Sequence, residues 1–311
     1  MTKPQHLLRK IILGIFCILL AVILVFTTVE FFYLAHYEKS KSTFDISAQQ
    51  NGNEITVMSA NVRCISPGDL GKKSWLYRAD LIIKNVAQNA PDIIGFQEVT
   101  KYHYSYLCDS LKGYDSVIEY RDETALSEGC PVFYNTSKFT LVDKGSFWLS
   151  ETPEKMSIDW GAACYRICSY VILNDKSSGK NFVVFNTHLD HVSDEARIKG
   201  IGVVLDKISQ FGGLPAMIMG DFNAEEDTET YKAVTKNFND AKYQTQDTMQ
   251  SCTYQNWGAE LDNPCIDYFM ISKTGFNVNS YKVITKTYDG VYPSDHFPIV
   301  MKVQLTQEDV K

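Results

Sequence analysis

An uncharged apolar run near the N-terminus is the feature that most restricts what this chain can fold into. The run IILGIFCILLAVILVFTTV, residues 11–29, is about 19 residues long, which is the length of a helix that crosses a bilayer. Lys3, Arg9 and Lys10 precede it, and three aromatic residues at 31–33 follow it as they would at a membrane interface. No small-x-small cleavage site follows, so an uncleaved anchor is favoured over a cleaved signal peptide.

This anchor divides the chain. The positive-inside rule places the N-terminus in the cytoplasm and everything after the run outside it, as in a single-pass membrane protein. The polar segment after the anchor has no structural periodicity and is predicted to be a tether. The expected organisation is a basic cytoplasmic segment, a transmembrane signal anchor, a tether, one folded domain and a tail, at residues 1–10, 11–35, 36–52, 53–306 and 307–311.

The composition of the whole chain excludes some classes of protein. It is 45% hydrophobic and 22% charged over 311 residues, which is ordinary for a globular domain. The net charge of -7 argues against a protein that coats nucleic acid, since it provides no general attraction for phosphate backbones. The eight cysteines include no CxxC pair and no zinc-site spacing. In an exported domain, a Cys252–Cys265 disulfide would close a short loop.

Apolar periodicity after residue 53 predicts mixed strands with few helices between them. Helices are expected near 74–89, 193–211 and 228–237, where apolar residues follow the helical period or cap signals are present. The remaining apolar segments read as strands. We therefore expect an α/β (α+β) domain of two packed mixed β-sheets flanked by helices.

One of these strands ends in an unusual way. The segment PAMIMGDFN, residues 215–223, runs from a buried strand straight into Asp221 and Asn223. Residues two apart in a strand point to the same face, so both side chains emerge together at the strand's carboxyl end. Such ends are where loops build sites. The alternative is a simple β-turn, because Gly, Asp and Asn favour turns for local reasons.

Other predicted strands end in polar residues in the same manner. They contribute Asn61, Glu98, His188 and the Asp295-His296 pair, while Asp267 lies inside a further strand. Each has a structural alternative: a satisfied core histidine for His188, a helix cap for Glu98, a turn for Asp295-His296. Their joint occurrence indicates one shared rim of carboxylate, amide and imidazole groups.

The motifs SANVR, GFQEV, NTHLDH, MGDFNA, IDYF and SDHFP, in this order, closely resemble those of the endonuclease/exonuclease/phosphatase family. That family includes pancreatic deoxyribonuclease, exonuclease III, inositol polyphosphate 5-phosphatases, neutral sphingomyelinases and deadenylases. The resemblance spans roughly residues 54–304. It implies a four-layered α/β sandwich that hydrolyses a phosphate ester with a divalent metal, usually Mg²⁺, with Mn²⁺ as a substitute.

The resemblance also implies roles for the polar residues. Glu98 would be the principal metal ligand, with Asn61 and Asp295 beside it, which suits the preference of magnesium for oxygen ligands. Asp221 would orient or deprotonate the attacking water, and Asn223 would hold this water and a phosphate oxygen. His296 would be polarised by Asp267 and would face the phosphate. His188 would donate to a non-bridging oxygen of the phosphate. Whether Asp221 or His296 is the base stays open.

Three arginines complete the sequence prediction. Arg166 lies in an otherwise β-patterned strand, where an unpaired charge is costly, so it is predicted to be a phosphate clamp or a structural pair with a catalytic carboxylate. Some nucleases of the family carry an acidic residue where this chain has Arg63, which favours a single metal. Arg78 also resembles an arginine of some family members, but a position on a solvated helix face explains it equally.

The expected function is divalent-metal-dependent hydrolysis of a phosphate ester, phosphodiesterase-like or nuclease-like, in a membrane-tethered extracytoplasmic domain. A phospholipid, sphingomyelin or inositol-phosphate substrate is the alternative on the same site. A non-catalytic binding module is disfavoured, because every expected ligand and catalytic residue is present. The partners are thus a phosphate-ester substrate and the membrane, and the substrate itself stays open.

Overall fold

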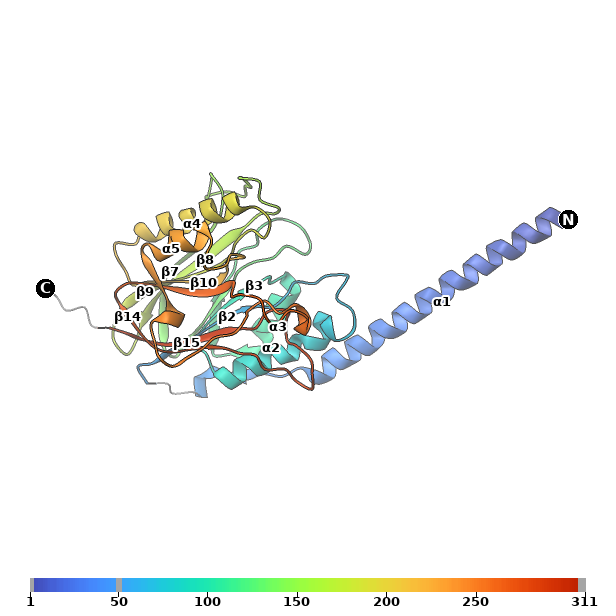
Figure 1. Cartoon of the computed structure of the whole chain (residues 1–311). Coiled ribbons are helices and arrows are strands. Elements are labelled where there is room, and N and C mark those ends of the chain that lie inside the picture. The colour runs from blue at the N-terminus through green and yellow to red at the C-terminus, as the bar shows by residue number, and fades with distance from the viewer. Residues whose placement is uncertain (1–2, 49–51, 307–311) are drawn as a thin grey trace. The chain divides into compact units, whose positions relative to one another are not determined.

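The computed structural model describes residues 3–48 and 52–306 (Figure 1). The chain separates into two compact units, Met1–Lys41 and Ser42–Lys311. The predicted tail at 307–311 lies outside the described residues.

The first unit is a single long helix, α1 (Lys3–Ser40). Its stretch from Gln5 to Ser40 is long and apolar enough to cross a membrane, by length and composition alone, and a signal sequence would pass the same test. Its leucine, isoleucine and phenylalanine side chains are exposed within the unit. The helix includes the predicted anchor and continues beyond residue 35 to Ser40.

The second unit begins with a short strand and a 3₁₀ turn. Strand β1 (Phe44–Asp45) pairs in parallel with β4 (Leu111–Lys112) and is followed by the 3₁₀ turn η1 (Ile46–Ala48). The side chain of Ile46 is completely buried. The described part of segment 36–52 is therefore not the structureless tether that its polarity predicts, because its few apolar side chains find partners in the fold.

Two mixed sheets form the centre of this unit. The six-stranded sheet has the order β11-β13-β10-β9-β8-β7. Its strands, in that order, are Phe238–Asp240, Asp267–Ser272, Ala216–Asp221, Asn181–His188, Ile167–Asp175 and Phe139–Trp148. Only β9 and β10 pair in parallel within it.

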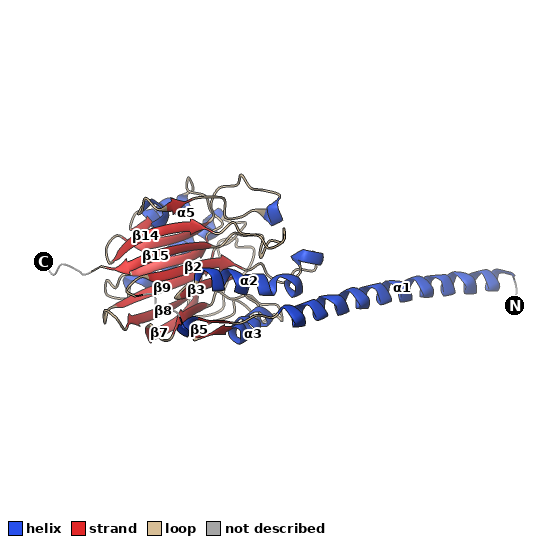
Figure 2. Cartoon of the chain, turned by 90° about the horizontal axis from the view of Figure 1, so that it is seen from below, coloured by secondary structure: helices blue, strands red, loops and turns tan. Residues whose placement is uncertain are grey.

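The seven-stranded sheet has the order β12-β14-β15-β2-β3-β6-β5. In that order its strands are Thr248–Met249, Phe276–Val283, Ile299–Leu305, Ile55–Asn61, Ile93–Gln97, Val132–Asn135 and Tyr114–Val117. Figure 2 shows β14, β15, β2 and β3 side by side, with helix α2 (Trp75–Asn89) near the ends of β2 and β3. The remaining helices and 3₁₀ turns are η2 Gly71–Lys73, α3 Lys101–Ser110, α4 Asp194–Ser209, α5 Glu229–Thr235, η3 Ala241–Tyr243 and η4 Asn256–Gly258.

Apolar side chains from both sheets meet in the main core, which includes Val57, Ile93, Val184, Met217 and Met301. A second core lies between the six-stranded sheet and helices α4 and α5. Helices α2 and α3 cover the outer face of the other sheet (Figure 1). The predicted four-layered α/β sandwich is confirmed.

Three predicted placements differ in detail. Arg166 directly precedes β8 and is not within a strand, Asp267 is the first residue of β13, and Asp295-His296 precede β15. Strand β13 runs antiparallel to β10, and β15 antiparallel to β2. The starts of β13 and β15 therefore lie at the same edge of the sandwich as the ends of their neighbours.

Candidate active site

The strand register brings the predicted polar residues to one rim. Asp221, the last residue of β10, is in register with His188 of β9 on one side and Asp267 of β13 on the other. Asn61 ends β2 of the facing sheet, and Glu98 follows the end of β3. Because these ends converge, residues far apart in sequence become neighbours.

Asp221 is the centre of this group. Its Oδ2 lies 3.1 Å from Nδ2 of Asn61, 3.5 Å from Nε2 of His188 and 3.6 Å from Nε2 of His296. Burial and the charge of Asp267 raise the pKa of Asp221 to about 7, although His296 opposes the shift. A buried carboxylate that titrates near neutral pH can accept a proton during turnover.

Asp267 lies behind His296. Its Oδ2 is 2.9 Å from Nδ1 of His296, which fixes the ring and turns Nε2 toward Asp221. Burial alone would lower the pKa of His296, but the carboxylates of Asp267 and Asp221 outweigh it and raise this pKa to about 10. His296 is therefore an imidazolium at neutral pH and provides a fixed positive charge.

Glu98 is held by hydrogen bonds from two sides. Its Oε1 accepts from Nδ2 of Asn61 at 2.9 Å, and its Oε2 accepts from the backbone N–H of Cys64 at 2.7 Å. Its backbone has a φ of 61°, a left-handed conformation that is uncommon for glutamate. Burial opposes ionisation of Glu98, yet these two donors and the charge of His296 lower its pKa below the usual range. The carboxylate is therefore ionised.

Asp295 and Arg63 meet on the same side of the site. Nη1 of Arg63 lies 3.4 Å from Oδ2 of Asp295, and its Nε lies 2.9 Å from Oδ2 of Asp69. Arg63, which stands where some nucleases of the family have an acidic residue, thus places a positive charge beside the predicted metal ligand Asp295.

Asn223 and His188 are joined directly. Nδ2 of Asn223 lies 2.9 Å from Nε2 of His188 and donates to the carbonyl of Leu189 at 3.1 Å. Burial and the nearby Arg166 lower the pKa of His188 well below its ordinary value, so its ring is neutral. In this arrangement Nε2 of the imidazole accepts from the amide, so it can donate to a phosphate oxygen only when it carries the proton and the Asn223 amide turns away.

Arg166 lies at the next position along the rim and is 6% exposed. Its Nη2 lies 3.0 Å from Nδ1 of His191, and its Nε lies 3.7 Å from Asp190 without a hydrogen-bond partner among the described residues. Most of its N–H groups therefore have no acceptor from the described part of the protein. The carboxylate pairing foreseen as the alternative involves Asp190 and not a residue of the Asp221 group.

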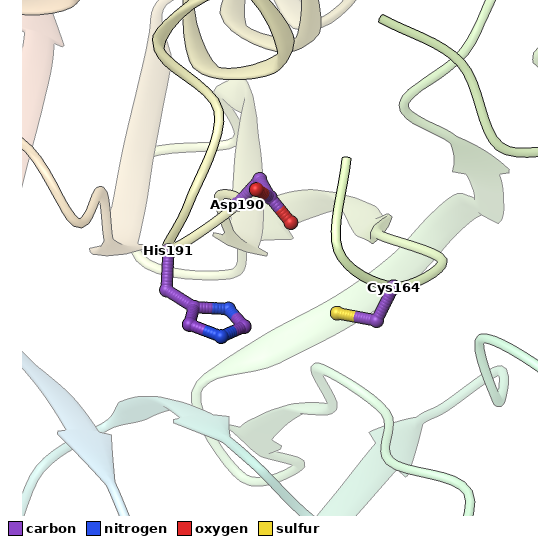
Figure 3. Close-up of side chains that lie close together, drawn as sticks. All are labelled: Cys164, Asp190 and His191. Atoms are coloured by element: carbon purple, nitrogen blue, oxygen red, sulfur yellow. The ribbon is translucent and has the colours of Figure 1, made fainter. Parts of the chain in front are cut away.

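Asp190, His191 and Cys164 lie close together (Figure 3), and their ligand atoms are within 4.8 Å of one another. The oxygens of Asp190 already accept from the backbone N–H groups of Val192, Ser193 and Ala163. His191 and Asp190 both face Arg166, so this cluster positions the guanidinium of Arg166. A second group with the same spacing comprises Asp221, Asp267 and His296.

These side chains surround one cleft of about 380 Å³. Of the predicted residues, it is lined by Glu98, Arg166, His188, Asp221, Asn223, Asp295 and His296. Asn61 and Asp267 lie one hydrogen bond behind this lining, against Glu98 and His296. All nine predicted residues thus belong to one connected site.

Several residues of the site are not evident from the sequence. Arg121, Glu128 and Tyr254 also line the cleft from loops, where no periodicity marks them. Arg78 is completely buried, so the solvated helix face is wrong for it. Its guanidinium donates to four carbonyls, those of Val62, Arg63, Lys73 and Pro293. The sequence signal for this burial was that Arg78 lies among apolar residues on its face of the helix.

Comparisons with known proteins agree with this geometry. The model of the Endonuclease/Exonuclease/phosphatase family matches residues 58–296. A mannosyl-6-phosphatase of Bacteroides thetaiotaomicron is 33% identical, with a TM-score of 0.75 over 81% of this chain and 100% of that chain. An endonuclease/exonuclease/phosphatase structure from Bacteroides vulgatus is 29% identical, with a TM-score of 0.78 over 82% of this chain and 100% of that one.

Human nocturnin is 27% identical over 267 residues, which are 75% of this chain. The match spans 59% of the length of nocturnin.

Proposed function

We propose, because this chain belongs to the endonuclease/exonuclease/phosphatase family, that its cleft hydrolyses a phosphate ester by in-line attack of water on phosphorus. The chain is a phosphoesterase hydrolase of that family, and the roles of its residues are our assignment. One observation carries this assignment, an unbroken series of polar contacts through the rim that runs Asp267, His296, Asp221, Asn61, Glu98.

Asp221 is the base in this proposal. Its pKa near 7 matches the task of taking a proton from water at neutral pH. The water oxygen forms a bond to phosphorus while the bond to the ester oxygen breaks. Asp221 takes the proton of the water, and the departing oxygen takes a proton from bulk solvent. The products are an alcohol and inorganic phosphate, or a second phosphate ester if the substrate is a diester.

The other side chains hold the phosphate. His296 contributes a permanent positive charge, and Arg166 contributes N–H groups that have no acceptor among the described residues. Asn223 would hold the water from the β9–β10 side, and His188 would donate to a phosphate oxygen once its Nε2 carries the proton and is released from Asn223. Donors that are already in place act more strongly on developing negative charge than donors that must reorganise.

Glu98, Asn61 and Asp295 would hold Mg²⁺, which prefers oxygen ligands and few carboxylates, and Mn²⁺ would bind the same set. The Asn61 amide must turn to do so, because its Nδ2 now faces Glu98 and its oxygen accepts from the backbone N–H of Arg63. Glu98 is ionised, as a ligand must be. Such an ion neutralises the phosphate and polarises the departing oxygen. Arg63, paired with Asp295, supports a single ion, because its charge lies beside the third ligand.

The substrate that we favour is a small phosphate monoester. The cleft of about 380 Å³ is near the lower end of small-molecule pockets, and the net charge of -7 does not attract a polynucleotide. The mannosyl-6-phosphatase of Bacteroides thetaiotaomicron supports a sugar phosphate. A nucleic-acid or lipid phosphodiester is the competing substrate on the same site.

Hydrolysis assays test this function on the full chain in detergent. Mannose 6-phosphate, bis-p-nitrophenyl phosphate, plasmid DNA, RNA and sphingomyelin would be assayed with Mg²⁺ and with a chelator. We expect turnover of the monoester that needs the metal and falls at least 100-fold in both Asp221→Ala and His296→Ala. Faster turnover of a diester would replace the proposed substrate, and turnover that survives both variants would refute the site.

We also propose that α1 is a signal anchor with the catalytic unit outside the cytoplasm, supported by its apolar length and the basic residues before it. Protease added to intact spheroplasts should digest the catalytic unit, whereas a cytoplasmic location would protect it until lysis.

A further inference from the structure

Arg121 and Glu128 form an ion pair in the wall of the cleft that the proposed hydrolysis does not use. Nη1 and Nη2 of Arg121 donate to the two carboxylate oxygens of Glu128 at 2.9 and 2.8 Å. The two side chains are 18% and 14% exposed. Both line the cleft together with Glu98 and Asp221. The pair thus faces the space that a substrate would fill.

The backbone holds this pair close to the reacting groups. Gly129 forms β-bridges with both Tyr120 and Val99, and Val99 directly follows Glu98. A Cβ at Gly129 would lie 2.5 Å from the carbonyl oxygen of Glu119, so these two segments of the chain approach as closely as a glycine permits. Nε1 of Trp148 donates to the carbonyl of Arg121 at 2.8 Å. The pair is therefore a fixed feature of the cleft.

An ion pair of this kind has unused hydrogen-bonding capacity of both types. Among the described residues, the carboxylate of Glu128 accepts only from Arg121, and Nη1 and Nη2 of Arg121 each carry a second N–H beyond the one that they donate to Glu128. Each carboxylate oxygen can accept a further bond, and the guanidinium can donate further bonds. A ligand group that both donates and accepts would satisfy both members.

The charges of this wall exclude other ligand groups. Burial and Glu98 raise the pKa of Glu128 to about 7, Arg121 opposes this shift, and above that pH the Glu128 carboxylate neutralises Arg121, so the pair carries no net positive charge. A second phosphate on the leaving group would therefore find no net positive charge at this pair, whereas Arg166, which lines the same wall, can bind the phosphate that reacts. An apolar leaving group would leave the ion pair desolvated and without partners.

We propose that Arg121 and Glu128 form a leaving-group subsite that binds the hydroxyls of an uncharged, polyhydroxylated alcohol. The preferred substrate class is then the phosphate monoester of a sugar-like alcohol. This inference rests on the proposed phosphoesterase function and deepens it. Glu128 accepts from one hydroxyl and Arg121 donates to a neighbouring one. The subsite therefore selects leaving groups with hydroxyls and does not bind a second phosphate.

The test compares two substrates on the full chain in detergent with Mg²⁺. A panel of hexose 6-phosphates carries hydroxyls, and phenyl phosphate carries none at similar size. The quantity measured is the ratio of kcat/KM for the best hexose phosphate to kcat/KM for phenyl phosphate. Any loss of folded enzyme lowers both values equally and leaves this ratio unchanged, so a folding defect cannot imitate the result.

We expect the ratio to fall at least tenfold in Glu128→Gln, because a charged acceptor for a hydroxyl is lost. Glu128→Asp, which keeps the charge but withdraws it by one methylene, should give an intermediate ratio. Glu123→Gln is the matched control, since Glu123 is exposed on the same loop and does not line the cleft.

An unchanged ratio in Glu128→Gln overturns the inference. So does a wild-type chain that hydrolyses phenyl phosphate or a diester but no hexose phosphate, and in that case the proposed hydrolysis stands. Failure of every phosphate ester with the wild-type chain refutes the proposed function and the inference with it.

Discussion

A single glycine at the end of β10 decides how closely this strand approaches β9 beside the site. Gly220 precedes Asp221 with a φ of 141°, and a Cβ there would lie 1.9 Å from the carbonyl of Thr187 on β9. We predict that Gly220→Ala lowers the free energy of unfolding by about 2–4 kcal/mol, because strain and a clash with main chain add. Gly290→Ala is the control for positive φ alone, since its φ is 73° with no atom within 4 Å. Equal losses in urea unfolding would refute the clash.

The buried Arg78 is the second residue on which the site depends. It joins the segment after Asn61 to the segment before Asp295 through the carbonyls of Val62, Arg63 and Pro293. Arg78→Met should cost about 3 kcal/mol, because buried carbonyls lose their donor. Lys84→Met on the same helix, where the side chain is 47% exposed, should cost less than about 1 kcal/mol. Similar losses for both in thermal or urea unfolding would contradict a special role for Arg78.

At the scale of elements, the hairpin between β8 and β9 brings Arg166, which directly precedes β8, beside the end of β9 at His188. The carboxylate of Asp175 accepts from the backbone and hydroxyl groups of Ser177 and Ser178 in its turn. Burial opposes ionisation, but these bonds lower the pKa of Asp175. A lowered pKa in the folded state stabilises the protein above the unfolded value of about 3.9, and the effect disappears as pH falls through the folded pKa.

We therefore predict that Asp175→Asn costs about 1–2 kcal/mol at pH 7 and progressively less below about pH 4. Urea unfolding of the wild type and the variant at several pH values measures this difference. Asp206→Asn, an exposed carboxylate on α4, should show no such dependence. A gap that stays constant with pH would show that the charge of Asp175 is not what stabilises the turn.

At the scale of the whole molecule, the catalytic unit begins earlier than the predicted boundary at residue 53. Ile46 is completely buried and the ring of Phe44 contacts that of Tyr114. We predict that a fragment of residues 42–311 unfolds cooperatively and is about 2 kcal/mol more stable than 53–311, since burial of an isoleucine contributes about this much. Ile46→Ala in the longer fragment should remove most of the difference. Equal urea midpoints would place the boundary at 53 after all.

The sequence by itself determined much of this account. Periodicity predicted α2, α4, α5 and the strands that end at Asn61 and Asp221, because apolar patterns and caps are local properties of the chain. The order of the polar motifs predicted the family and the residues that the cleft brings together. The polarity of 36–52 was misleading, since a few apolar side chains suffice to order such a segment.

The tertiary structure alone decided what these residues meet. Asp267 begins β13 and His296 precedes β15, and only the antiparallel pairing of these two strands turns their starts toward the ends of β10 and β2. The burial of Arg78 and the pairing of Arg121 with Glu128 likewise depend on loops packed against distant strands. Local sequence encodes which side chains are available, whereas charge, burial and pKa arise from neighbours that only the packing of two sheets brings within a few ångströms.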